Sequence, residues 1–194
     1  MMPASVRSLL ILIFIFAAAL SLLAACEKSA DAVRRGEYLA RLGGCHDCHT
    51  PKILAAGKPA APDAARLLSG HPENVAYPTW MSQEPNEANA LVLTTPMLTA
   101  WAGPWGVSFA ANLTPDKATG LGEWSEETFI RAMRTGKHQG QANGRDILPP
   151  MPWADYKEAT DEDLKAIWAY LRSVPAVKNQ VPTPVPPGAR PPPS

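Results

Sequence analysis

The pattern of hydrophobic and polar residues divides this chain into three kinds of segment. Residues 9–23 form an apolar run in which only Ser21 is polar. Around 31–42, 125–136 and 160–173, apolar residues recur every three or four positions, which predicts three amphipathic helices. Residues 50–110 contain eight prolines and lack a helical period, so we expect this region to be rich in loops.

Capping residues support the three predicted helices. Asp31, Ser125 and Thr160 are suitable N-caps, and Gly136 is a natural helix stop. The apolar positions that we expect in the core are Val33, Tyr38, Leu39, Leu42, Phe129, Ile130, Met133, Leu164, Ile167, Trp168 and Leu171.

One glycine lies inside the first predicted helix. Gly36 costs about 1 kcal/mol relative to Ala in a helix. A close crossing by another helix would offset this cost, and we expect that helix to be the last one, through Trp168 or Tyr170.

The N-terminus has the pattern of a secretory signal. Arg7 precedes the apolar run, and small residues follow it. Leu23-Ala24-Ala25-Cys26 resembles a bacterial lipoprotein box, in which Cys26 would become the lipid-bearing first residue. An uncleaved anchor and an ordinary cleaved signal are the alternatives. All three place the protein outside the cytoplasm, and we expect a periplasmic, membrane-anchored lipoprotein.

Composition excludes one class of partner. The chain of 194 residues has 18 basic and 18 acidic residues, giving a formal charge of zero. No strong basic field favours nucleic acid. The length suits one domain with tails. Three cysteines are present, so Cys26 is the odd one if Cys45 and Cys48 share a role.

Residues 45–49 read Cys-His-Asp-Cys-His, which is the attachment motif of a c-type haem. Two thiols about one helical turn apart can bond the two vinyl groups of the porphyrin, and His49 can then bind the iron. A thioredoxin-like redox pair would not need His49. A zinc site would need two further ligands, and His71 and His138 are distant in sequence. We therefore expect one covalently bound haem c.

A second chemical feature is Met151, which lies in Leu-Pro-Pro-Met-Pro-Trp. The prolines fix an extended backbone, so the thioether can be presented to the open face of a haem. His71, Met81, Met97 and His138 are further conceivable ligands. We interpret them as a turn residue, two core methionines and a loop histidine, respectively.

The order of these elements resembles a class I cytochrome c. Three blocks carry the resemblance: residues 36–51, 112–136 and 150–171. It is closest to the cytochrome c domains of electron-transfer subunits in bacterial periplasmic dehydrogenases. The resemblance implies an all-α fold whose first and last helices cross beside one haem, with a loop-rich insertion after the haem motif. It also implies that Cys45 and Cys48 attach the haem, with His49 and Met151 as axial ligands.

The expected organisation is a signal peptide at 1–25, a tether at 26–33, a cytochrome domain at 34–178 and a disordered proline-rich tail at 179–194. With both axial positions filled, we expect a monohaem electron carrier rather than an enzyme. Its partners would be dehydrogenases, oxidases or other cytochromes. A haem protein with an open sixth site, or a dedicated subunit of one complex, is the alternative. Arg134 or Arg145 could pair with a propionate.

Overall fold

The crossing of the first and last helices anchors the fold. The computed structural model describes residues 4–77 and 92–187. Helix α1 (Ala4–Leu42) packs on α5 (Asp161–Ser173). At the crossing, a Cβ on Gly36 would overlap the backbone of Ala166 and lie 2.8 Å from Cβ of Tyr170. The expected close approach at Gly36 is confirmed, with Ala166 and Tyr170 as the contacts.

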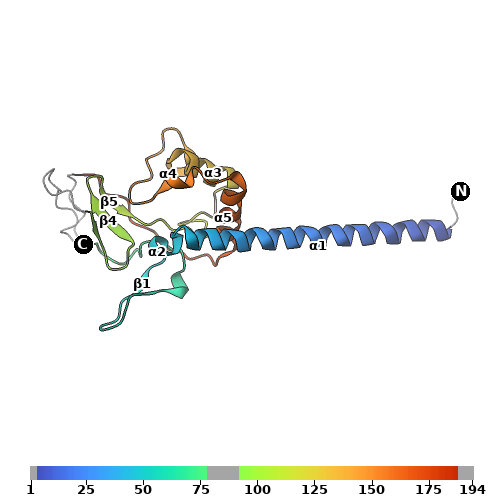
Figure 1. Cartoon of the computed structure of the whole chain (residues 1–194), viewed down its shortest axis with the longest axis horizontal. Coiled ribbons are helices and arrows are strands. Elements are labelled where there is room, and N and C mark those ends of the chain that lie inside the picture. Colours follow the sequence, from blue (N-terminus) through green and yellow to red (C-terminus); the bar gives the residue numbers. More distant parts are fainter. Residues whose placement is uncertain (1–3, 78–91, 188–194) are drawn as a thin grey trace.

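Helix α1 is much longer than the sequence pattern indicated. It has 39 residues, a length of about 58 Å at 1.5 Å per residue. Figure 1 shows its N-terminal part projecting from the body of the protein. We expected the helix to start near Asp31 after a polar tether, but residues 26–33 are helical. The physical reason is that residues 4–35 contain neither glycine nor proline.

The C-terminal part of α1 packs its apolar face against the main core. That core joins α1 and α5 to α3 (Glu126–Thr135) and to the loops that precede α3. Within it, the rings of Phe129 and Trp168 stack with their centroids 5.5 Å apart. Its buried members are Ala40, Leu68, Leu121, Phe129, Ile167, Trp168, Tyr170, Leu171 and Val174. Tyr38 and Leu42, which we expected to be buried, are 56% and 70% exposed because they lie on the outer side of α1.

The predicted caps of α3 and α5 are confirmed. Ser125 Oγ accepts a hydrogen bond from the Thr128 amide at 3.2 Å, and Thr160 Oγ1 accepts one from Asp163 at 3.1 Å. Gly136 ends α3 in the left-handed region, at φ 67°. Arg134 pairs with Asp161 at 2.6 Å and so joins the end of α3 to the start of α5.

Two small sheets qualify the all-α expectation. An antiparallel pair, β1 (Lys52–Ile53) and β2 (Ala61–Pro62), follows the short helix α2 (Cys45–His49). A second antiparallel sheet has the order β3 (Leu93–Thr94), β4 (Ala100–Gly103), β5 (Gly106–Phe109). These strands of two to four residues are too short to show a clear period in sequence, and the prolines around them indicated loops. The fold remains mostly helical.

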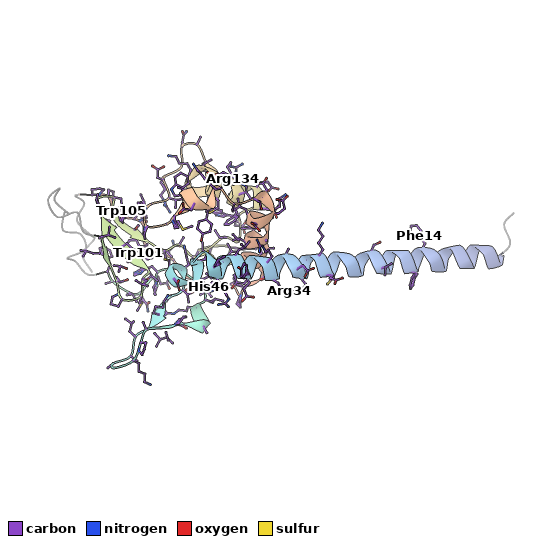
Figure 2. All side chains as sticks on the ribbon, in the orientation of Figure 1. Phe14, Arg34, His46, Trp101, Trp105 and Arg134 are labelled. Carbon is purple, nitrogen blue, oxygen red and sulfur yellow. The ribbon has the colours of Figure 1, made fainter. Side chains whose placement is uncertain are left out.

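Three short helical segments complete the described elements: η1 (Ala64–Arg66), η4 (His138–Gly140) and α4 (Trp153–Tyr156). In Figure 1 the β4–β5 hairpin lies at the end of the body opposite the projecting part of α1. Figure 2 shows Trp101 and Trp105 on this hairpin and His46 near the end of α1. No helix within the described residues is long and apolar enough to cross a membrane.

The segment after α5 is more ordered than we expected. Asn179 is 7% exposed, and its side-chain amide donates to the carbonyls of Ser69 and His71 at 2.6 and 2.9 Å. Val185 pairs with Val107 of β5 through two backbone hydrogen bonds of 2.8 and 2.9 Å. The prediction of disorder from residue 179 is therefore wrong for residues 179–187, because these polar groups are satisfied by the folded body.

Candidate haem site

Helix α2 places the two cysteines of the haem motif on one side of a single turn. Gly44, with φ 73°, turns the chain sharply between α1 and α2. Cys45 and Cys48 are then three residues apart in a helix, a spacing that brings side chains to neighbouring positions. Both thiols are free and partly buried. Burial raises the pKa of each thiol.

His49 is held from two directions. Its Nδ1 donates a hydrogen bond to the Ala111 carbonyl at 2.7 Å, and its own carbonyl accepts from Gly70 at 2.8 Å. The residue is 8% exposed, and burial lowers the pKa of its imidazole, which favours the neutral ring. With Nδ1 carrying the proton, Nε2 is the nitrogen free to bind a metal. Nε2 has no hydrogen-bond partner among residues 4–77 and 92–187.

Tyr156 joins α4 to the first attachment cysteine. Its hydroxyl donates to the Gly43 carbonyl and lies 3.6 Å from Cys45 Sγ. Burial, followed by the nearby cysteine, strongly raises the pKa of Tyr156, so the hydroxyl stays protonated as a donor. On the other side of the motif, the Tyr170 hydroxyl lies 3.1 Å from His46 Nε2. Helices α4 and α5 therefore both fix the orientation of α2.

Lys52 stabilises the C-terminal end of α2 through two hydrogen bonds. Its Nζ donates to the carbonyls of Asp47 and Thr50 at 2.6 and 2.9 Å. Sequence reasoning missed Lys52, Tyr156 and the Ala111 carbonyl. Each of the two side chains had one sequence signal: Lys52 is close in sequence to the haem motif, and Tyr156 is close in sequence to Met151. A backbone acceptor such as Ala111 leaves no signal in a side chain.

These residues fit a covalently attached haem. Two unpaired thiols lie one turn apart, and the adjacent histidine has its second nitrogen already engaged. The described part of the chain has no group of three or more His, Cys, Asp or Glu side chains that could hold a metal ion.

Met151 lies on the loop that leads into α4, five residues before Tyr156. Its side chain is partly buried, and its carbonyl accepts from the Trp153 amide at 2.9 Å. The Ser108 hydroxyl anchors the start of this loop by donating to the Pro149 carbonyl at 2.6 Å. The loop is thus fixed by β5 and linked through Tyr156 to the haem motif. The role of Met151 as distal ligand stays a prediction.

The other conceivable ligands lie in different surroundings. His71 is fully buried, with Nδ1 2.9 Å from Thr99 Oγ1 and Nε2 donating to the Val75 carbonyl at 2.9 Å, so both nitrogens are engaged in structural contacts. His138 is partly buried against Trp124 in an edge-on contact at 5.6 Å. Met97 lies in the turn between β3 and β4. Met81 lies outside the described residues.

Two tryptophans and the two arginines that we considered as propionate partners have contacts elsewhere in the fold. Trp153 packs against Gly136, and the Trp105 indole donates to Ser108 Oγ at 3.1 Å. Arg134 is engaged by Asp161. Arg145 is exposed and contacts the Asp146 carbonyl at 3.3 Å.

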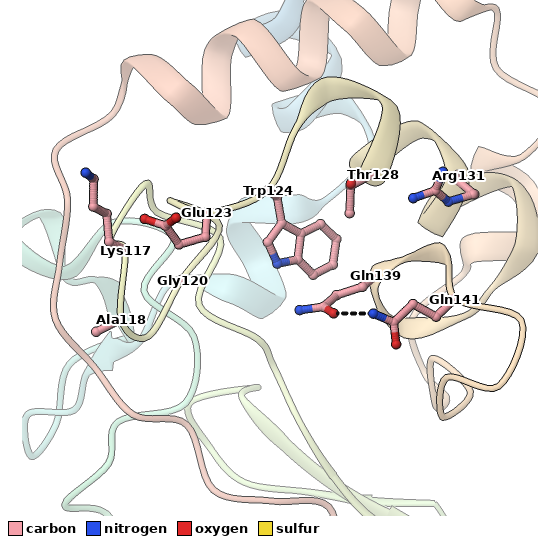
Figure 3. A pocket seen from close by; sticks show the side chains of 9 residues that line it. All are labelled: Lys117, Ala118, Gly120, Glu123, Trp124, Thr128, Arg131, Gln139 and Gln141. Carbon is pink, nitrogen blue, oxygen red and sulfur yellow. Dashed lines mark hydrogen bonds between the residues drawn. The ribbon is translucent and has the colours of Figure 1, made fainter.

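A separate hollow of about 320 Å³ lies around Trp124, between the 117–123 loop, the start of α3 and η4 (Figure 3). Lys117 and Arg131 lie on its rim, and on one side of it the Gln141 amide donates to the Gln139 side-chain oxygen at 2.9 Å. None of its lining residues belongs to the haem motif or to the Met151 loop.

Comparison with known proteins indicates the class of this protein. The gluconate 2-dehydrogenase cytochrome c subunit of Pantoea cypripedii is 33% identical over 146 residues, which is 75% of this chain and 24% of that protein. A nicotinate dehydrogenase subunit of Pseudomonas putida is 30% identical over 154 residues, 79% of this chain and 10% of that protein. The fructose dehydrogenase cytochrome subunit of Gluconobacter japonicus is 28% identical over 158 residues, 78% of this chain and 24% of that protein. No family model matches.

The similarity to these cytochrome subunits over about three quarters of the chain supports a c-type cytochrome electron-transfer domain, which is the class that the sequence predicted. Its relatives include cytochrome subunits of bacterial dehydrogenases. The chain spans about a quarter or less of the length of each relative above. The electron donor and acceptor of this chain are therefore matters for proposal.

Proposed function

We propose that this protein is a membrane-tethered monohaem cytochrome that carries single electrons between periplasmic redox partners. Cys45 and Cys48 would attach one haem c, and His49 and Met151 would be its axial ligands. The haem supplies a one-electron couple, and a Met ligand raises its potential relative to a second His. The chain itself orients the ligands and excludes water, so we assign it no catalytic residue.

The observation that carries this proposal is the hydrogen bond from His49 Nδ1 to the Ala111 carbonyl. It sets the tautomer and the ring orientation that a proximal ligand needs. A redox-active dithiol would not require either.

The relatives favour a dehydrogenase as electron donor, because three of them are named as subunits of such enzymes. We propose that the chain accepts electrons from a dehydrogenase subunit and passes them to another cytochrome or to an oxidase. Redox encounters of this kind generally use small, transient interfaces.

Membrane attachment is proposed through a lipid on Cys26. Cys26 is exposed on the projecting part of α1. Before it, Phe14, Phe16 and Leu20 are 79%, 73% and 60% exposed, an apolar surface that the folded body does not cover. Removal of residues 1–25 as a signal peptide would eliminate this surface and leave Cys26 as the first residue.

The ligand assignment is tested by visible spectra of the haem-loaded protein. We expect the weak far-red band of ferric Met-ligated haem in the parent protein and in the Met81→Ala and Met97→Ala variants, and its loss in Met151→Ala. Loss of the band in either of the other two variants would transfer the ligand role to that methionine. Absence of the band from the parent protein would favour an open sixth coordination site. Binding of carbon monoxide to the reduced haem would then identify a gas-binding haem protein.

The anchor is tested by the intact mass of the mature protein from membranes. We expect a chain that begins at Cys26 with added lipid, and release of Cys26→Ser from the membrane fraction. A parent chain that retains residues 1–25, or an unmodified Cys26, would contradict this part of the proposal.

A further inference from the structure

Lys52 is a buried cation next to the haem motif. It is the first residue of β1 and only 8% exposed. Its Nζ donates to the carbonyls of Asp47 and Thr50, which lie on either side of His49 in sequence. Carbonyls at the end of a helix lack amide partners within that helix, so they need donors from elsewhere. Lys52 supplies donors at the end of α2.

The charge of Lys52 is not neutralised by an ion pair with any described residue. Burial lowers the pKa of its ammonium, whereas the charge of Asp47 raises it. The Asp47 side chain is exposed, so solvent screens its charge more than that of Lys52.

The two hydrogen bonds of Lys52 reach the residue before Cys48 and the residue after His49, so its charge lies beside the haem motif. In the haem-loaded protein, Cys48 would be an uncharged thioether, and Lys52 would still donate to the carbonyls on either side of His49.

We propose that Lys52 is a positioning residue that braces the turn carrying His49 and favours the reduced haem with its fixed positive charge. This inference rests on the proposed function, because it requires a bound haem. Reduction lowers the charge of the haem by one unit, so a nearby cation stabilises the reduced state relative to the oxidised state. The effect is larger in a poorly solvated site than at the surface.

The test is an equilibrium redox titration of the haem-loaded full chain. Lys52→Met removes the charge and retains the length of the side chain, and Lys52→Arg retains the charge. Lys58→Met is the matched control, since Lys58 is exposed in the same hairpin. We expect Lys52→Met to shift the ratio of reduced to oxidised protein about tenfold toward the oxidised state, a decrease of about 59 mV for a one-electron couple.

In Lys52→Arg and Lys58→Met we expect the ratio of reduced to oxidised protein to stay within about threefold of that of the parent protein. Lys52→Arg retains the charge, and the charge of Lys58 is screened by solvent. A Lys52→Met shift no larger than that of Lys58→Met would overturn the inference. Lys52→Gln provides a second neutral variant that can still donate a hydrogen bond. If both neutral variants fail to attach haem while Lys52→Arg attaches it, Lys52 is only a structural brace and its effect on potential is rejected.

These outcomes are distinct from a failure of the proposed function. Wrong axial ligation is detected in the spectrum of the parent protein, whereas the Lys52 test compares variants that share one spectrum. A parent protein without a Met ligand could still show the Lys52 shift.

Discussion

The imidazole of His49 donates its Nδ1 hydrogen to the carbonyl oxygen of Ala111, 62 residues further along the chain, at 2.7 Å. Ala111 follows directly after β5 and Ala110, and the Ala110 carbonyl accepts from His71 at 2.9 Å. Because Gly70 in turn donates to the His49 carbonyl, the sheet region and the haem motif are connected on both sides. The loop-rich insertion thus holds His49, the proposed proximal ligand, in place.

The crossing of α1 and α5 predicts a stability effect at Gly36. In Gly36→Ala the added methyl group would overlap the Ala166 carbonyl, and the backbone of a helix cannot yield easily. We expect a loss of about 2 kcal/mol in the free energy of unfolding, as overpacking commonly causes. Urea denaturation of the haem-loaded protein measures this change.

The control for that experiment is Arg34→Ala, two residues away on the exposed side of α1, where Arg34 pairs with the exposed Asp31. We expect a change within about 0.5 kcal/mol. Equal effects at positions 34 and 36 would contradict the tight crossing.

Tyr156→Phe tests the link between α4 and the haem motif. The variant keeps the ring and removes the hydroxyl that donates to the Gly43 carbonyl. We expect a loss of about 1 kcal/mol in the free energy of unfolding, the usual value of one hydrogen bond. Tyr38→Phe is the matched control, because Tyr38 is 56% exposed, and it should change little. An unchanged stability of Tyr156→Phe would show that the hydroxyl does not fix α2.

Asn179→Ala tests the ordered segment after α5. The Asn179 side chain satisfies the Ser69 and His71 carbonyls and accepts from the Glu73 amide at 2.9 Å. Leaving these groups without partners should lower the free energy of unfolding by about 3 kcal/mol. Gln180→Ala, at the exposed neighbouring position, serves as control. Hydrogen exchange should also show faster exchange at Glu73 in Asn179→Ala alone. Equal stability of the two variants would contradict the anchoring of this segment by Asn179.

His71 predicts a dependence of stability on pH. Burial lowers the pKa of its imidazole in the folded protein, so the unfolded chain binds a proton more readily. The contribution of His71 to the free energy of unfolding is therefore fully present above its pKa in the unfolded chain, about 6.5. It is lost as the pH falls below that value. We expect urea midpoints to decrease between pH 7 and 5, with a weaker decrease in His71→Gln. An equally steep decrease in that variant would assign the effect to other groups, among them His46 and His138, whose pKa values burial also lowers.

The sequence by itself determined the local features of this protein. The haem motif is contiguous, so residues 45–49 alone predicted its chemistry. The caps Ser125 and Thr160 act within three residues of themselves, and the helix period marks the faces of α3 and α5. Gly36 also gave a correct signal, because only a close approach explains a glycine inside an otherwise regular helix.

Only the tertiary structure decided what depends on residues far apart in the chain. Ala111, Tyr156 and Lys52 surround the haem motif through backbone carbonyls and folded proximity, which no side-chain pattern encodes. The short strands of 92–110 form because they pair with each other rather than because of their own period. The segment at 179–187 is ordered because Asn179 and Val185 find partners in the body, whereas its prolines alone indicated disorder.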